Sequence, residues 1–134
     1  MTLVVDASVA VKWVLDEPAT EHAVALRASD RDLIAPSLVH AEIGSALWRA
    51  VLRGDVTPSV ASNALKVAIA HYARIFFLAE LADNALELAT RLRHPIYDCF
   101  YLALAQRERC ALVTADRRLL SAAKALTGIE VQAL

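Results

Sequence analysis

Short apolar runs alternate along the chain with longer stretches in which apolar residues recur every three or four positions. The short runs are typical of strands covered on both faces, and they predict strands at Leu3–Val5, Leu33–Ala35, Arg74–Ala79 and Ala111–Thr114, with a more exposed last strand at Ile129–Val131. The longer stretches predict helices at Ala7–Leu15, Pro18–Ala28, Ser37–Arg53, Thr57–His71, Asp83–Leu92, Pro95–Arg109 and Asp116–Leu126. Buried strands that alternate with helices favour an α/β fold, in which helices cover both faces of a mainly parallel sheet.

Several helix ends carry residues suited to them. Asp6 can cap the helix after the first strand, and Ser37 is the predicted N-cap of the long helix that ends before Gly54. Thr57 and Pro58 restart the chain as an N-cap followed by a proline in the first helical position. Positions 54–57 therefore separate two helices.

Length and composition narrow the class of protein. The chain has 134 residues, which fits one domain over residues 1–134 with a core of its own. Hydrophobic residues make up 57% and charged residues 22%, which excludes disorder, and only 3 Gly and 4 Pro favour a helix-rich fold over a β-sandwich. The formal net charge is −1, so any phosphate-binding surface has to be local.

No segment is predicted to span a membrane, because charged residues such as Lys66 and Glu80 interrupt the most apolar half well below the ~20 residues that a bilayer requires. The N-terminus lacks a basic region and reaches Asp6 too soon for a signal peptide. Cys99 and Cys110 lie about 16 Å apart if they share a helix, which is too far for a disulfide. We therefore expect a reduced, cytoplasmic protein.

Two acidic residues follow predicted strands directly. Asp6 comes after the first strand and Asp116 lies two residues past the fourth. In parallel sheets the ligand site forms beyond the carboxyl ends of the strands, so both positions suit an active site. Both also suit a helix N-cap, and the two roles are compatible because a capping carboxylate keeps lone pairs for a metal.

Two further acidic residues lie on helices. Glu42 borders the apolar face of its helix and shares a stripe with Ser45 and Arg49, where it is either a functional group or a solvated boundary residue. Asp98 lies in a helix that is apolar around nearly its whole circumference, so its carboxylate needs a cation or several donors, or else is protonated. The alternative is a first-turn acid that serves the helix dipole.

Gathered carboxylates repel one another, and a divalent cation removes that conflict. An all-oxygen ligand set favours Mg²⁺ or Mn²⁺ over Zn²⁺. The histidines, at positions 22, 40, 71 and 94, show no metal-ligand spacing and are interpreted as surface or core residues.

Four stretches of the sequence, in order, resemble the PIN domain, and specifically the toxin ribonuclease of VapBC toxin–antitoxin pairs. They are Val4-Val5-Asp6-Ala7-Ser8, Pro36-Ser37-Leu38-Val39-His40-Ala41-Glu42-Ile43, Tyr97–Ala105 and Thr114–Leu119. One such stretch is weak evidence, but four with family-like separations are strong, and together they cover essentially the whole chain.

This resemblance implies a three-layer α/β/α domain and an endoribonuclease that uses Mg²⁺ or Mn²⁺. It implies that the family's acidic quartet, which is catalytic and binds the metal, corresponds to Asp6, Glu42, Asp98 and Asp116. Ser8 matches the small polar residue after the first acid, and Thr114 matches the hydroxyl before the last one. The family often has Asn three residues after its glutamate, whereas this chain has Ser45, to which we assign only a supporting role.

The residues themselves favour hydrolysis by water, since no Ser–His or Cys–His pairing suggests a covalent nucleophile. The hypothesis is that a metal held chiefly by Asp6 and Asp98 activates the water, that Glu42 helps to hold the metal or accepts the proton, and that Asp116 completes or bridges a second site. Phosphates of the substrate could meet the cations Lys12, Arg49, Arg117 and Arg118. Few aromatic residues interleave with these cations, so we expect a structured RNA recognised by shape.

The resemblance also implies an antitoxin partner. Trp48, Val51 and Leu52 fall on the side of the Glu42 helix away from its main apolar face. They suggest either a groove for a partner helix or a homodimer face, although a second layer of helices in the same domain could cover them.

Other classes of protein fit less well. A phosphatase of the haloacid-dehalogenase type needs a second Asp where this chain has Ser8, and a two-component receiver needs an Asp where the third strand is followed by Glu80 and Leu81. The alternative that stays open is a catalytically weak PIN-like module that acts by binding RNA or a partner.

Overall fold

The five strands form one parallel sheet in the order β3-β2-β1-β4-β5. In the computed structural model, which describes all residues 1–134, the strands are β1 (Thr2–Val5), β2 (Asp32–Pro36), β3 (Arg74–Phe76), β4 (Ala111–Thr114) and β5 (Val131–Ala133). The order reverses beside β1, because the chain runs outward from β1 through β2 to β3 and then crosses to β4 on the other side. Ligands of parallel sheets bind at such a reversal, beyond the carboxyl ends of the strands.

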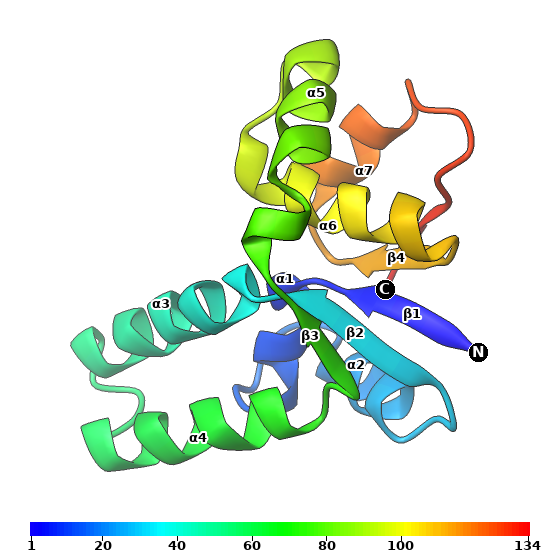
Figure 1. The fold of residues 1–134 in the computed structure, drawn as a ribbon. Helices are drawn as coiled ribbons and strands as arrows, with labels where there is room; N and C mark the ends of the chain where they lie inside the picture. Colours follow the sequence, from blue (N-terminus) through cyan, green and yellow to red (C-terminus); the bar gives the residue numbers. More distant parts are fainter.

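Helices cover both faces of the sheet, which confirms the predicted three-layer α/β/α fold (Figure 1). Four helices lie on one side, together with a 3₁₀ turn at Val11–Trp13: α1 (Ala7–Ala10), α2 (Thr20–Arg27), α3 (Leu38–Leu52) and α4 (Pro58–Ala70). On the other side, after a 3₁₀ turn at Leu78–Glu80, lie α5 (Ala82–Leu92), α6 (Ile96–Glu108) and α7 (Arg117–Ala123). This division follows from right-handed crossovers, because the two directions of winding place their helices on opposite faces.

The core occupies both faces of the sheet, and α6 contributes its longest buried helical segment. The segment Tyr101–Ala105 of α6 is buried without interruption, as the all-round apolar pattern predicted, and it packs over β1, β2 and β4. The three apolar residues of β1, Leu3–Val5, are buried on both faces of the sheet. The acid-bearing ends of β1 and α6 are therefore held by the best-packed part of the molecule.

Helices α3 and α4 form a hairpin that projects away from the sheet (Figure 1). Gly54 has a φ of 79°, which glycine adopts without strain, and the Thr57 hydroxyl accepts a hydrogen bond from the Val60 N–H as the predicted N-cap. Ser37 precedes α3 as expected, but its side chain makes no capping hydrogen bond, so that prediction was wrong. Its backbone N–H instead donates to Phe76 O at the end of β3.

Four elements are shorter or shifted relative to their prediction. The third strand ends at Phe76 because its partner β2 ends at Pro36, and the last strand begins at Val131 because its register is set by pairing with β4. The first helix tightens into the 3₁₀ turn at Val11–Trp13, and α7 ends at Ala123, before the predicted limit. Apolar runs alone do not show where a pairing partner stops.

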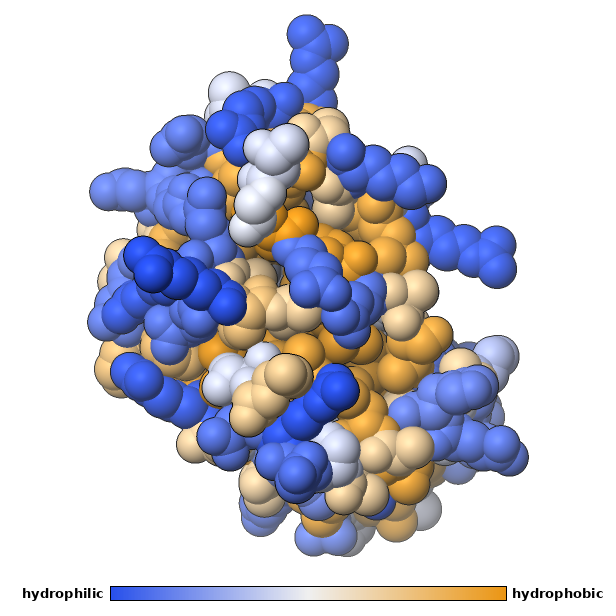
Figure 2. Space-filling model, turned by 90° about the vertical axis from the view of Figure 1, so that its right-hand side faces the viewer, coloured by the Kyte–Doolittle hydropathy of each residue, from blue (hydrophilic) through white to orange (hydrophobic).

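No helix in the structure combines the length and the apolar character that a membrane crossing needs. Cys99 and Cys110 are both free thiols, as their separation predicted. The face from which β1 starts carries hydrophilic side chains interspersed with hydrophobic ones (Figure 2). The acidic residues of interest lie at the opposite ends of the strands.

Candidate active site

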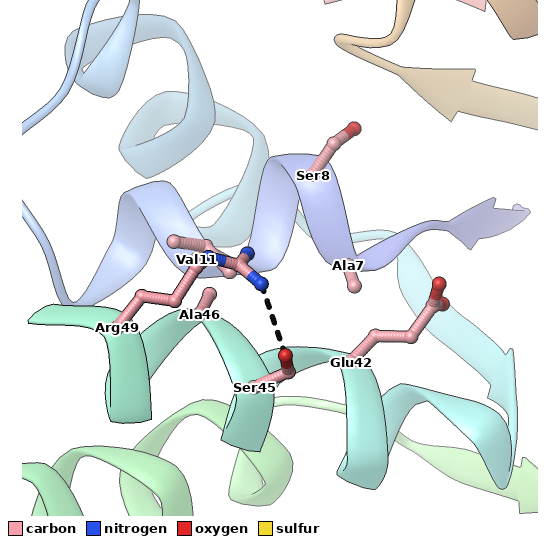
Figure 3. Close-up of a pocket in the computed structure, with 7 residues that line it drawn as sticks. All are labelled: Ala7, Ser8, Val11, Glu42, Ser45, Ala46 and Arg49. Carbon is pink, nitrogen blue, oxygen red and sulfur yellow. Dashed lines mark hydrogen bonds between the residues drawn. The ribbon is translucent and has the colours of Figure 1, made fainter.

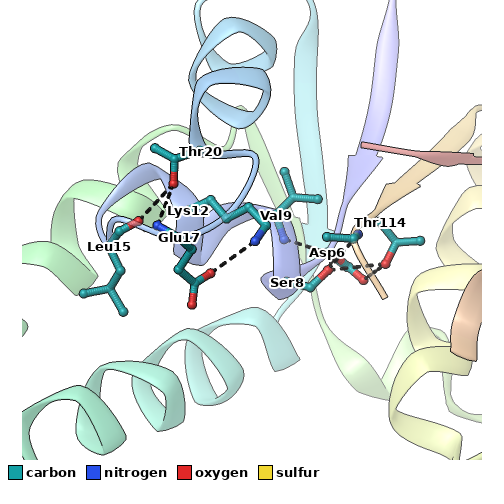
Figure 4. Close-up of polar contacts among 9 residues, drawn as sticks. Asp6, Ser8, Val9, Lys12, Leu15, Glu17, Thr20 and Thr114 are labelled. Atoms are coloured by element: carbon teal, nitrogen blue, oxygen red, sulfur yellow. Dashed lines mark hydrogen bonds and ion pairs between the residues drawn. The ribbon is translucent and has the colours of Figure 1, made fainter. Parts of the chain in front are cut away.

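Asp6 stands at the carboxyl end of β1 and is only 4% exposed. Its Oδ1 accepts hydrogen bonds from the Ser8 hydroxyl (2.5 Å) and from the Val9 N–H (3.3 Å), so Asp6 does cap α1. Its Oδ2 accepts from the Thr114 hydroxyl at 2.5 Å (Figure 4). The carboxylate is thus held by donors from α1 and from β4, which are far apart in sequence.

The two hydroxyls are themselves oriented by the backbone. The Ala115 N–H donates to Ser8 Oγ and the Asp116 N–H donates to Thr114 Oγ1, both at 3.0 Å. Because each oxygen already accepts a backbone hydrogen bond, its own proton is free to point at Asp6. Ser8 and Thr114, which the resemblance singled out, therefore hold the first acid in place.

Burial raises the pKa of the Asp6 carboxyl to about 7, and the negative charge of Asp98 contributes in the same direction. The hydrogen bonds from Ser8, Thr114 and the Val9 N–H oppose this shift, but they do not cancel it. Asp98 therefore lies within electrostatic reach of Asp6.

Glu42 projects from α3 toward the same region, and the hydroxyl of Tyr101 on α6 donates to its Oε1 at 2.6 Å. Burial is the main cause that raises the pKa of Glu42, Asp98 raises it further, and the Tyr101 hydrogen bond lowers it. The pKa of Tyr101 lies well above its ordinary value, because of burial and of the charge on Glu42. Tyr101 lies in one of the stretches that resemble the PIN domain, but the sequence predicted no role for it, although a tyrosine in a fully buried helix needs a partner for its hydroxyl.

Asp98 lies in the first turn of α6, and its Oδ2 is 2.6 Å from Nε2 of His94. The expectation that this carboxylate needs a partner was right. The partner itself was missed, because His94 was interpreted as an ordinary surface or core residue. The available signal was a histidine four residues before the acid, on the other side of Pro95.

Asp116 caps α7, and its Oδ1 accepts from the Arg118 N–H at 2.8 Å. It is tied to the other acids through its backbone N–H on Thr114, and it adds no charge effect to the pKa of Asp6 or Glu42. The structure thus brings Asp98 into electrostatic range of both Asp6 and Glu42, whereas the Asp116 carboxylate caps α7. No three Asp, Glu, His or Cys side chains lie close enough together to hold a metal jointly.

A cavity of about 270 Å³ lies between α1 and α3, and Glu42 and Ser8 both border it (Figure 3). Arg49, two turns after Glu42 on α3, also borders it, and its Nη1 donates to Ser45 Oγ at 3.0 Å. The predicted stripe of Glu42, Ser45 and Arg49 therefore does face one space. The Ser45 hydroxyl oxygen accepts this hydrogen bond from Arg49 and forms none with an acidic side chain.

Among the other candidate cations, Lys12 pairs with Glu17 at 3.3 Å (Figure 4). Arg117 is exposed and borders a separate cavity together with Lys12 and Thr114. No arginine or lysine forms an ion pair with Asp6 or Glu42 in the structure. Asp6 and Glu42 therefore have no basic side-chain partner, whereas Asp98 has His94.

The sequence matches the PIN domain family over residues 3–125. Ribonuclease VapC3 of Pyrobaculum aerophilum is 31% identical over 121 residues, which cover 89% of this chain and 92% of that protein. Ribonuclease VapC1 of Mycobacterium tuberculosis is 35% identical over 130 residues, which cover 89% of each protein. The fold is similar to the crystal structure of VapBC2 from Rickettsia felis bound to a DNA fragment from their promoter, with a TM-score of 0.73 and 16% identity over 100% of this chain and 99% of that one.

Proposed function

This chain belongs to the PIN domain family as one of its VapC-type members, and we propose that it is a Mg²⁺- or Mn²⁺-dependent endoribonuclease, the toxin of a VapBC-type toxin–antitoxin pair. The observation that carries the proposal is the cluster of Asp6, Glu42 and Asp98: the charge of Asp98 raises the pKa of both Asp6 and Glu42, and no lysine or arginine pairs with either of them. The two relatives, each named a ribonuclease, support the substrate class.

The donor set fits a hard divalent cation. All the acidic side chains offer oxygen, and Mg²⁺ is commonly held by one or two carboxylates while it keeps several waters, so it does not require three protein ligands in contact. We assign Asp6 and Asp98 as the principal ligands, with Glu42 beside them and Asp116 at the margin. The chemistry that a bound cation supplies is Lewis acidity, which lowers the pKa of an attacking water and neutralises charge on the scissile phosphate.

Four side chains of the protein have further roles in the proposed reaction. Ser8 and Thr114 orient the Asp6 carboxylate, because Ser8 donates a hydrogen bond to Oδ1 and Thr114 donates one to Oδ2. Glu42 has a raised pKa, which suits it to accept a proton from water nearer to neutral pH than an exposed glutamate would. Arg49, held by Ser45 at the edge of the cavity, supplies a positive charge for a substrate phosphate.

Cleavage of total RNA tests this proposal. The wild-type protein should cut RNA with Mg²⁺ and lose the activity in EDTA, and Asp6→Asn and Asp98→Asn should each reduce it to the EDTA background. Asp30→Asn, at an exposed position, is the matched control and should cut normally. Full activity in EDTA or in either site variant would refute the metal-dependent scheme, and RNA binding without cleavage by the wild type would favour the catalytically weak module.

Partners form part of the same proposal: an antitoxin encoded with the toxin, a structured RNA and a second copy of the chain, all in the cytoplasm. On α3, Trp48 is 60% and Leu52 is 66% exposed, and Trp48 borders an apolar groove between α3 and α4. Helix α4 therefore covers this side of α3 only in part. Trp48→Ser should weaken antitoxin binding in a co-purification assay, while Leu86→Ser on α5, where Leu86 is 58% exposed, should not.

A further inference from the structure

His94 is the side-chain partner of Asp98. Its Nε2 lies 2.6 Å from Asp98 Oδ2, and the two side chains are only 11% and 23% exposed. Water therefore competes weakly for this contact. No other side chain forms a hydrogen bond with Asp98, so its Oδ1 is the oxygen left to meet a ligand.

The backbone of His94 is held in place on both sides. Helix α5 ends at Arg93 in the left-handed conformation, with a φ of 51°, and the His94 N–H donates to Ala89 O at 3.2 Å. Pro95 then fixes the entry into α6, and the Cys99 thiol lies 4.0 Å from the His94 carbonyl oxygen. A histidine whose backbone is anchored in the turn between α5 and α6 can in turn hold the side chain of Asp98.

Asp98 needs such a restraint because of its neighbours. Its charge raises the pKa values of both Asp6 and Glu42, so the same repulsion acts on Asp98 itself. An unrestrained aspartate in the first turn of a helix can rotate toward solvent or toward free backbone N–H groups. A fixed donor on one oxygen prevents that rotation.

We propose that His94 is a positioning residue that holds Asp98 at the acidic cluster, ready to bind a divalent cation. This inference rests on the proposed function. Hydrogen-bond partners of carboxylate ligands orient the ligand, and their removal typically lowers metal affinity about 10- to 100-fold. His94 contributes by placing Asp98 and does not contact RNA or water in the reaction.

Mn²⁺ binding to the metal-free protein tests this role without RNA cleavage. The binding is monitored by electron paramagnetic resonance, as the loss of the signal of free Mn²⁺. His94→Leu fills the space without donating a hydrogen bond, and its Mn²⁺ dissociation constant should rise about 10- to 100-fold. His94→Gln can still donate to Oδ2 and should stay within a few-fold of the wild type. His22→Leu, at an exposed position on α2, is the matched control and should bind Mn²⁺ normally.

Thermal unfolding in EDTA shows whether each variant is folded. If His94→Leu does not fold, His94→Asn takes its place, because its amide is polar but too short to reach Asp98. The role of His94 is overturned if the folded Leu or Asn variant binds Mn²⁺ as tightly as the wild type, or if Gln restores nothing. If the wild type and Asp6→Asn bind Mn²⁺ equally weakly, the proposed function itself fails, and the inference fails with it.

Discussion

Replacement of Asp6 by Asn should make the metal-free protein more stable at pH 8, although it removes the central acidic residue. Asp6 is buried, no cation pairs with it, and its pKa is raised from 3.8 to about 7. The folded state therefore holds the Asp6 proton more tightly than the unfolded state does. Asn has nearly the same shape as a protonated Asp and carries no charge at any pH.

The size of the effect follows from that shift. A rise of about 3 pKa units corresponds to roughly 4 kcal/mol, at about 1.4 kcal/mol per unit, as an upper limit. Between pH 3.8 and 7 the folded state binds more protons than the unfolded state, so stability falls as pH rises, and above pH 7 the contribution is lost. From pH 5 to pH 8 the wild type should lose on the order of 2–3 kcal/mol of stability through Asp6, and Asp6→Asn should not.

The hydrogen bonds of residue 6 should be kept in Asp6→Asn, except that the bond with Thr114 reverses its donor and acceptor. The Asn carbonyl oxygen can keep the bonds from Ser8 and the Val9 N–H, while its amide faces Thr114 Oγ1, which then has to accept. The Thr114 proton can turn to Ser8 Oγ, 3.3 Å away. The expected gain at pH 8 is therefore about 2–3 kcal/mol, below the upper limit of roughly 4 kcal/mol.

Urea unfolding in EDTA at pH 5 and pH 8 tests this prediction. Asp30→Asn, at an exposed position, is the control, and its free energy of unfolding should equal that of the wild type at both pH values. Adding Mg²⁺ at pH 8 should then stabilise the wild type but not Asp6→Asn, because only the native carboxylate binds the cation. The reasoning is wrong if the Asn variant is less stable than the wild type at pH 8, or if the difference between them is the same at both pH values.

Three further predictions concern single side chains. Tyr101→Phe removes the hydroxyl that donates to Glu42, so it should lower kcat with little change in KM. Its control is Tyr72→Phe, which removes a hydrogen bond to the Val5 carbonyl oxygen and should lower only the midpoint of urea unfolding. Arg109→Gly should raise the free energy of unfolding by about 1 kcal/mol, because residue 109 has a left-handed φ of 53°. Thr57→Ala should lower the thermal midpoint by removing about 1 kcal/mol of capping, and Thr57→Ser should restore it.

The pattern of apolar residues was sufficient to predict the class of fold and the location of most elements. Val4 and Val5 in a buried run, and Leu112 and Val113 in another, require coverage on both faces, which only a sheet between helix layers supplies. Element ends were less predictable, and β3 shows why. The run continues through Phe77 in sequence, but the strand stops where β2 no longer offers backbone partners.

What the sequence by itself determined is which acidic residues are anomalous: two that follow buried strands, one inside an apolar helix, and one at the edge of an apolar face. Only the tertiary structure decided what holds Asp6, Glu42 and Asp98. The sheet order places Thr114 beside Asp6. The packing of α6 places Tyr101 in contact with Glu42, and the turn after α5 places His94 in contact with Asp98. Local spacing predicts periodic elements because they depend on neighbouring residues, whereas these contacts depend on how separate elements pack, and sequence spacing does not encode that directly.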